Sequence, residues 1–65
     1  MNLEKHSFWK AKNGHIMVVT GFFYADIERR QVDGYTLVQS DENKEKIVRA
    51  VDLHKLVLSG DYAKL

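Results

Sequence analysis

The amino-acid sequence predicts a mainly β fold: a small antiparallel barrel or meander of four or five strands with a short helical turn near the C-terminus. Residues that favour strands, β-branched and aromatic, gather in several short runs. Turn dipeptides occur at Asn13-Gly14 and Asp33-Gly34. Helical spacing of apolar residues follows Asp52. At 65 residues the chain holds one domain, residues 1–65.

The N-terminal part is predicted to form a hairpin. Residues 3–12 are typical of a short strand behind a charged lead-in. Asn13 and Gly14 then predict a type I′ turn, which needs positive φ at both of its central residues. Residues 15–25 carry the strongest strand signals, and a helix is unfavourable across Gly21.

The middle of the chain is predicted to hold a loop, a turn and a third strand. Residues 25–30 fit a long charged loop or one helical turn capped by Asp26. Asp33-Gly34 is the second turn dipeptide, and residues 35–40 alternate as a strand. We expect Tyr35 and Leu37 on one side of this strand, and Thr36 and Val38 on the other.

The last third of the chain is predicted to end in a helical turn. Residues 41–46 form a charged loop and residues 47–51 a further strand. Asp52 is the expected N-cap of the helix, and Gly60 the stop, because glycine readily takes the left-handed conformation past a helix end. We expect Leu53, Leu56 and Leu58 to close one end of the barrel, with Tyr62 and Leu65 able to pack back from the tail. The alternative is a docking or dimer contact through Leu58, Tyr62 and Leu65.

The order of these elements between Phe8 and Leu56 resembles that of SH3-like barrels. The resemblance implies a small β-barrel whose long second strand contributes to two sheets and whose helical turn lies near the last strands. The stretch NGHIMVVTG, residues 13–21, is similar to the glycine- and valine-containing strand of KOW-type modules. The glycine spacing after Gly21 departs from a KOW repeat, so no binding residues are transferred.

The strand at residues 15–25 is apolar on both of its predicted faces. An antiparallel strand with one wet face should alternate apolar and polar residues. Gly21 therefore predicts a bulge, after which different side chains point inward, or else a partner or second copy covers one face. One face holds Ile16, Val18, Thr20, Phe22 and Tyr24, and the other holds Met17, Val19, Gly21, Phe23 and Ala25.

Net charge and the absence of cysteine limit the classes of protein to which this chain can belong. Ten basic residues oppose nine acidic residues, and a net charge of +1 is not typical of a dedicated duplex-DNA binder. The chain has no cysteine, which excludes disulfides and thiolate zinc sites and fits a reducing compartment. No apolar run reaches the roughly 20 residues of a membrane span, and residues 1–12 lack the apolar region of a signal peptide. We therefore expect a soluble cytoplasmic protein with no membrane partner.

The sequence shows no motif for catalysis or metal binding. Ser7 adjoins His6, but neighbouring residues of a strand point to opposite faces. A P-loop, a nucleophile elbow and a zinc-protease motif are all missing. His15, His54 and Asp52 match no compact metal spacing with His6. We expect no enzymatic activity, no cofactor and no metal.

The first functional interpretation is a non-catalytic module that binds another protein. Stand-alone domains of this size are common among phage- and mobile-element-encoded regulators or inhibitors of host machinery, an analogy of size. Aromatic and arginine side chains dominate protein interfaces, where truncation often costs about 2 kcal/mol or more. The predicted partner-binding residues are Trp9, Phe23, Tyr24, Arg29 and Arg30.

Two other interpretations stay open. The alternative is binding to single-stranded nucleic acid, RNA in particular, because aromatic rings stack on bases and cations bind phosphates. The acidic neighbours of the arginines oppose it. A homodimer, in which apolar strand faces pair across a two-fold axis, is compatible with either. The predicted nucleic-acid-binding residues are Lys10, Lys12, Phe22, Tyr24, Arg29 and Arg30.

Overall fold

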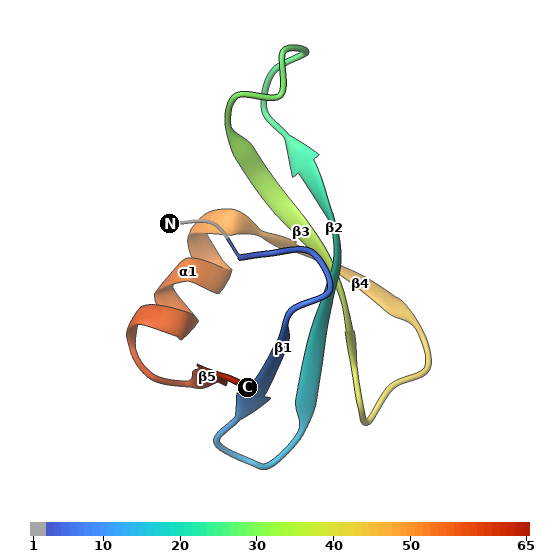
Figure 1. Cartoon of the computed structure of the whole chain (residues 1–65), viewed down its shortest axis with the longest axis vertical. Coiled ribbons are helices and arrows are strands. Elements are labelled where there is room, and N and C mark those ends of the chain that lie inside the picture. The colour runs from blue at the N-terminus through green and yellow to red at the C-terminus, as the bar shows by residue number, and fades with distance from the viewer. Residues whose placement is uncertain (1–2) are drawn as a thin grey trace.

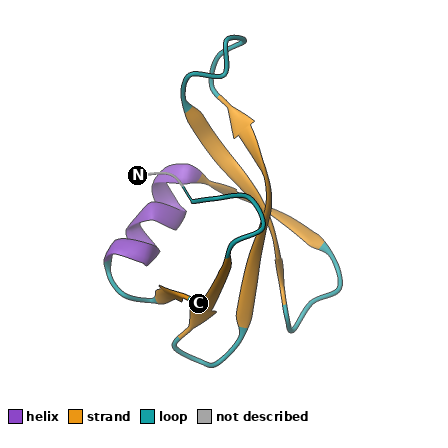
Figure 2. Cartoon of the chain, in the orientation of Figure 1, coloured by secondary structure: helices purple, strands orange, loops and turns teal. Residues whose placement is uncertain are grey.

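The computed structural model describes residues 3–65, which form one antiparallel sheet of five strands and one helix (Figures 1 and 2). The strand order across the sheet is β4-β3-β2-β1-β5. The predicted mainly β, antiparallel fold is confirmed, but the sheet does not close into a barrel, because β4 and β5 remain as its two edges. The elements are β1 (Phe8–Ala11), β2 (Ile16–Tyr24), β3 (Val32–Gln39), β4 (Glu45–Arg49), α1 (Ala50–Leu58) and β5 (Tyr62–Lys64).

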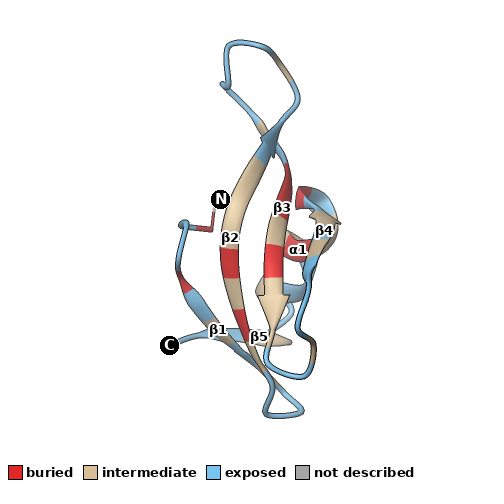
Figure 3. Cartoon of the chain, turned by 90° about the vertical axis from the view of Figure 1, so that its right-hand side faces the viewer, coloured by how far each residue is buried: buried red, intermediate tan, exposed pale blue. Residues whose placement is uncertain are grey.

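The core lies on the face of the sheet that α1 covers, which we call the inner face (Figure 1). Buried positions line β2 and β3 (Figure 3), and Tyr35 and Leu37 share the inner side of β3, as the alternation predicts. The segment before β1 packs on the same face and buries Leu3. The buried apolar residues are Leu3, Met17, Val19, Tyr35, Leu37, Ala50 and Leu53.

A bulge interrupts β2 at Gly21. Val19 pairs with Leu37, whereas Gly21 pairs with Thr36, so Thr20 is an extra residue in the ladder. Thr20 Oγ1 lies 2.8 Å from Thr36 Oγ1, and a Cβ on Gly21 would come within 2.9 Å of the same Thr36 oxygen. The glycine therefore leaves the space that this pair of hydroxyls occupies.

The bulge changes which side chains of β2 point inward. Before it, Met17 and Val19 are buried. After it, Phe22 pairs with Tyr35 on the inner face, and their ring centroids lie 5.7 Å apart in an edge-to-face contact. Phe23 thereby moves to the opposite, outer face. The predicted bulge is confirmed, although β2 stays within a single sheet.

Both glycine turns differ from their predictions. Only the glycine of the first turn has positive φ, +90° at Gly14, so the predicted type I′ turn is wrong. Its N–H instead donates to the Ala11 carbonyl, as in a three-residue hairpin loop with a left-handed glycine. Asp33 and Gly34 lie inside β3 and form no turn. Gly34 pairs with Phe23, and Asp33 is left over at a second register shift.

The helix begins earlier than predicted. β4 runs from Glu45 to Arg49, and α1 starts at Ala50 with no loop between them, so Asp52 is not the N-cap. Asp52 lies instead in the first turn, where its Oδ2 accepts a hydrogen bond from Arg49 Nε at 3.0 Å. Ala50 is buried, and alanine has the highest helix propensity, which together favour the early start.

The helix ends as predicted. Gly60 has a φ of +85° and its N–H donates to the Val57 carbonyl, while the N–H of Asp61 donates to the Leu56 carbonyl. These two bonds make a Schellman motif. The chain then returns as β5, which pairs with β1 and brings Tyr62 against the core.

Two C-terminal leucines predicted to pack are exposed. Leu58 is 73% exposed and Leu65 is 67% exposed, whereas Leu53 is buried. Leu58 follows Leu53 by five residues, which at about 100° per residue places it on a different side of the helix. The prediction that Leu58 and Leu65 pack against the fold is therefore wrong, and their alternative role in a docking or dimer contact stays a prediction.

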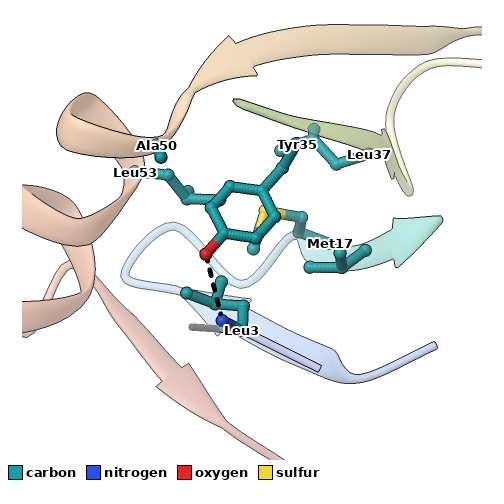
Figure 4. Close-up of a cluster of buried hydrophobic side chains, with 7 residues drawn as sticks. Leu3, Met17, Tyr35, Leu37, Ala50 and Leu53 are labelled. Atoms are coloured by element: carbon teal, nitrogen blue, oxygen red, sulfur yellow. Dashed lines mark hydrogen bonds between the residues drawn. The ribbon is translucent and has the colours of Figure 1, made fainter. Parts of the chain in front are cut away.

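A buried hydrogen-bond network joins three parts of the chain. The Tyr35 hydroxyl accepts the backbone N–H of Leu3 at 3.1 Å (Figure 4), and it lies 2.7 Å from His54 Nε2 on α1. The hydroxyl has one proton, which it donates to Nε2 only when that nitrogen carries none. Burial lowers the pKa of His54 and so favours this neutral form.

We expect the protein to lose stability as the pH falls through the titration range of histidine. The pKa of folded His54 lies below its ordinary value of 6.5, so the unfolded chain takes up the proton first and the free energy of unfolding falls. Urea unfolding from about pH 7.5 to about pH 5 measures this loss. His54→Gln should remove most of it, whereas His15→Gln, at an exposed position, should keep it. An unchanged pH dependence in His54→Gln would contradict the assignment.

Gly21→Ala should destabilise the protein through a clash with Thr36. Overpacking of this kind costs about 1–3 kcal/mol. Thr36→Ala removes the clashing oxygen, so the cost of Gly21→Ala should be smaller in that background. Urea unfolding of the wild type, both single variants and the double variant measures this coupling. If Gly21→Ala lowered the free energy of unfolding equally in wild type and in Thr36→Ala, the backbone conformation, and not contact with Thr36, would be what requires glycine at position 21.

Candidate protein-binding surfaces

The β2–β3 hairpin projects beyond the helix and the rest of the sheet (Figure 1). We call residues 23–32 of this hairpin the finger. Tyr24 pairs with Val32 at the end of the ladder, and residues 25–31 form the connecting loop. Every residue from 23 to 31 is at least partly exposed, so the finger offers nearly its whole surface for contact.

Asp26 organises the loop of the finger. Its backbone carbonyl accepts the N–H of Arg29 at 3.2 Å, and its Oδ1 accepts the N–H of Arg30 at 2.9 Å. The Arg30 guanidinium also lies 3.3 Å from Asp26 Oδ2 and 2.6 Å from Glu28 Oε2. These residues form a turn and no helix, so the loop predicted as one of two alternatives is confirmed.

The loop of the finger carries an isolated apolar side chain, Ile27. It is 97% exposed, more than any other large apolar residue that the structure describes. Its sequence neighbours are Asp26 and Glu28, so charged groups flank it. Sequence reasoning missed this residue. The available signal was an apolar residue between two acids in a charged loop.

Two aromatic residues lie on opposite sides of the finger. Phe23, on the outer face, is 45% exposed and packs beside Gly34, whose added Cβ would lie 3.8 Å from Phe23 Cβ. Tyr24, on the side of Phe22, is 39% exposed, and Arg29 Cζ lies 5.8 Å from its ring centroid. This is a cation–π geometry. The finger therefore gathers Phe23, Tyr24, Arg29 and Arg30 from the predicted partner-binding set.

The other predicted site residues lie elsewhere. Trp9 packs against the core on the inner face, and its Nε1 donates to Ser7 Oγ at 2.9 Å. Lys12 pairs with Asp61 at 3.3 Å, and the pKa of Asp61 is lowered by a hydrogen bond from Ser59 as well as by this lysine. Phe22 lies on the inner face, and Lys10 lies on the outer face of β1. The structure does not bring the six predicted nucleic-acid-binding residues onto one surface.

A second apolar surface lies on the outer face of the sheet, opposite α1. Phe8 is 53% exposed and Ile47 is 71% exposed. A shallow hollow of about 200 Å³ lies beside Phe8 near the turn at Ser40, lined by Phe8, Ile16, Val18, Val38, Gln39 and Ser40. We call the apolar members of this surface the outer patch: Phe8, Ile16, Val18, Val38 and Ile47.

Neither a metal site nor a membrane-spanning helix is present among residues 3–65. No three histidine, aspartate or glutamate side chains come together there as metal ligands. The helix found in this part of the chain is too short and too polar to cross a bilayer.

Comparisons with known proteins show no relative of this chain. No protein-family model, no curated protein and no solved structure matches it.

Asp26→Ala should loosen the loop of the finger while the sheet stays folded. The change removes the side-chain acceptor of the Arg30 N–H and one carboxylate of an exposed ion pair. Exposed pairs contribute little, so the free energy of unfolding should change by less than about 1 kcal/mol. Amide hydrogen exchange should become faster at Arg30 and stay unchanged at Val19 in β2. Unchanged exchange at Arg30 would show that Asp26 does not hold the loop.

Proposed function

We propose that this protein is a non-catalytic module that binds another protein through the finger. The observation that carries the proposal is Ile27, an apolar side chain 97% exposed in a loop held by hydrogen bonds. A module of this kind suits a regulator or inhibitor, which acts by occupying a surface of its target. Its target is expected to offer an apolar pocket with polar groups around the rim.

The order of the loop before binding supports this proposal. A loop that is already fixed loses less conformational entropy on binding than a mobile one. Asp26 and Arg30 hold the backbone on both sides of Ile27. The exposed Phe23 and Tyr24 add the residue types that dominate interface energetics.

Charge distribution favours a protein over a nucleic acid as the target. Arg30 is paired with two carboxylates of its own loop, and a phosphate would have to displace them. Asp26 and Glu28 also repel a phosphate backbone. Arg29 stays available over the ring of Tyr24, but one cation is a weak basis for nucleic-acid affinity.

Ile27→Lys should strongly weaken binding of the protein target. Affinity capture from a lysate, followed by titration of the purified target, should show at least a tenfold loss of affinity, about 1.4 kcal/mol. Leu58→Lys is the matched control, because Leu58 is 73% exposed but lies on α1. Equal binding by Ile27→Lys and wild type would overturn the proposal. Recovery of RNA, lost in an Arg29→Ala variant, would favour the nucleic-acid alternative.

A further inference from the structure

The outer patch is an apolar surface on the side of the sheet that faces solvent. An antiparallel sheet with one wet face normally alternates apolar residues inside with polar residues outside. Here β2 places Ile16 and Val18 outward between Phe8 on β1 and Val38 on β3, as the register pairs show. Ile47 extends the same surface onto β4, where it pairs with Thr36. The helix covers only the opposite face.

The core is small for a chain that lacks other support. Seven apolar residues are buried among those described, all of them on the inner face. The chain has no cysteine, and residues 3–65 hold no cluster of metal ligands. Domains of this size commonly add disulfides, a metal or another chain to a core of a few kcal/mol.

We propose that a second copy of this chain covers the outer patch, so that two sheets pack face to face across a two-fold axis. Opposite charges at the two margins of the outer patch favour a second copy as the occupant. Lys10 lies on the outer face of β1, at one margin of the patch, and Glu45 lies on β4 at the other margin. A two-fold axis that runs along the strands between β2 and β3 places β1 of each copy over β4 of the other.

The register of the sheet places these opposite charges one same-face step apart in height. Lys10 pairs with Ile16, while Glu45 lies level with Val18 through Val38. These are neighbouring same-face positions, about 7 Å apart along a strand, which a lysine side chain can span. The axis makes the contact twice, once from each copy.

The carboxylate of Glu45 is already held over the outer face. Its Oε2 lies 2.8 Å from Thr20 Oγ1, which in turn lies 2.8 Å from Thr36 Oγ1. Both threonines belong to the outer face beside the outer patch. The acid is therefore placed to meet a cation that approaches from above the sheet.

The same superposition brings the two most exposed members of the outer patch within one same-face step of each other. Phe8 lies level with Val18, and Ile47 lies level with the bulge, again one same-face step apart. With β1 over β4, Ile47 of one copy lies diagonally across from Phe8 of the other.

An axis along the strands leaves both fingers pointing toward the same end of the dimer. The finger and the outer patch use different residues, so the dimer is independent of the proposed target of the finger. A dimer would present two copies of Ile27 to a repeated or symmetric target and raise its avidity.

Light scattering across a dilution series, from about 1 μM to about 1 mM, tests the dimer. Wild type should reach the mass of two chains at the upper concentrations. Ile47→Lys should remain a monomer, whereas Leu58→Lys, equally exposed but on α1, should behave as wild type. A wild-type monomer at every concentration, or a dimer that survives Ile47→Lys, would overturn the proposal.

Charge reversal tests the register. Lys10→Glu and Glu45→Lys should each weaken association at low salt by about tenfold or more, because like charges then face each other. The double variant should regain most of the affinity, since the pair is restored with its signs exchanged. Thermal unfolding followed by circular dichroism confirms that each variant is folded. Failure of the folded double variant to regain affinity would overturn this arrangement of the two sheets.

Discussion

The buried hydroxyl of Tyr35 is the contact on which most of the structure depends. A buried hydroxyl without partners would cost about 1–3 kcal/mol, so its partners must stay in place. Those partners are the backbone of Leu3, 32 residues away in the chain, and His54 on α1, 19 residues away. One side chain therefore positions the segment before β1 and the helix on the same face of the sheet.

The bulge at Gly21 divides the long hairpin into two parts with different roles. On the N-terminal side of the bulge, Met17 and Val19 of β2 fill the core. On its C-terminal side, Phe22 points inward beside Tyr35, and Phe23 points to the outer face. This shift in the alternation of side chains comes from one inserted residue, Thr20. It separates the part of the hairpin that packs in the core from the part that continues as the exposed finger.

Local signals in the sequence predicted the first four strands, the alternation along β3, the bulge and the helix stop at Gly60, but not β5, which lies in a predicted tail. Each of these depends on neighbouring residues or on the conformational freedom of a single glycine. The turn at Asp33-Gly34 was wrong because pairing between Gly34 and Phe23 extends the ladder past a dipeptide that favours turns. The exposure of Ile47 could not be predicted, since it depends on which face receives α1, whereas the exposure of Ile27 had a local signal in its two acidic neighbours.

The direct junction between β4 and α1 sets the orientation of the helix. Because Arg49 ends the strand and Ala50 begins the helix, no loop absorbs a change in length. One residue inserted there would rotate all of α1 by about 100° and carry Leu53 and His54 away from the sheet. We therefore expect natural variation in length to occur in the loop of the finger, and residues 49–50 to form a point of fixed length in the evolution of this fold.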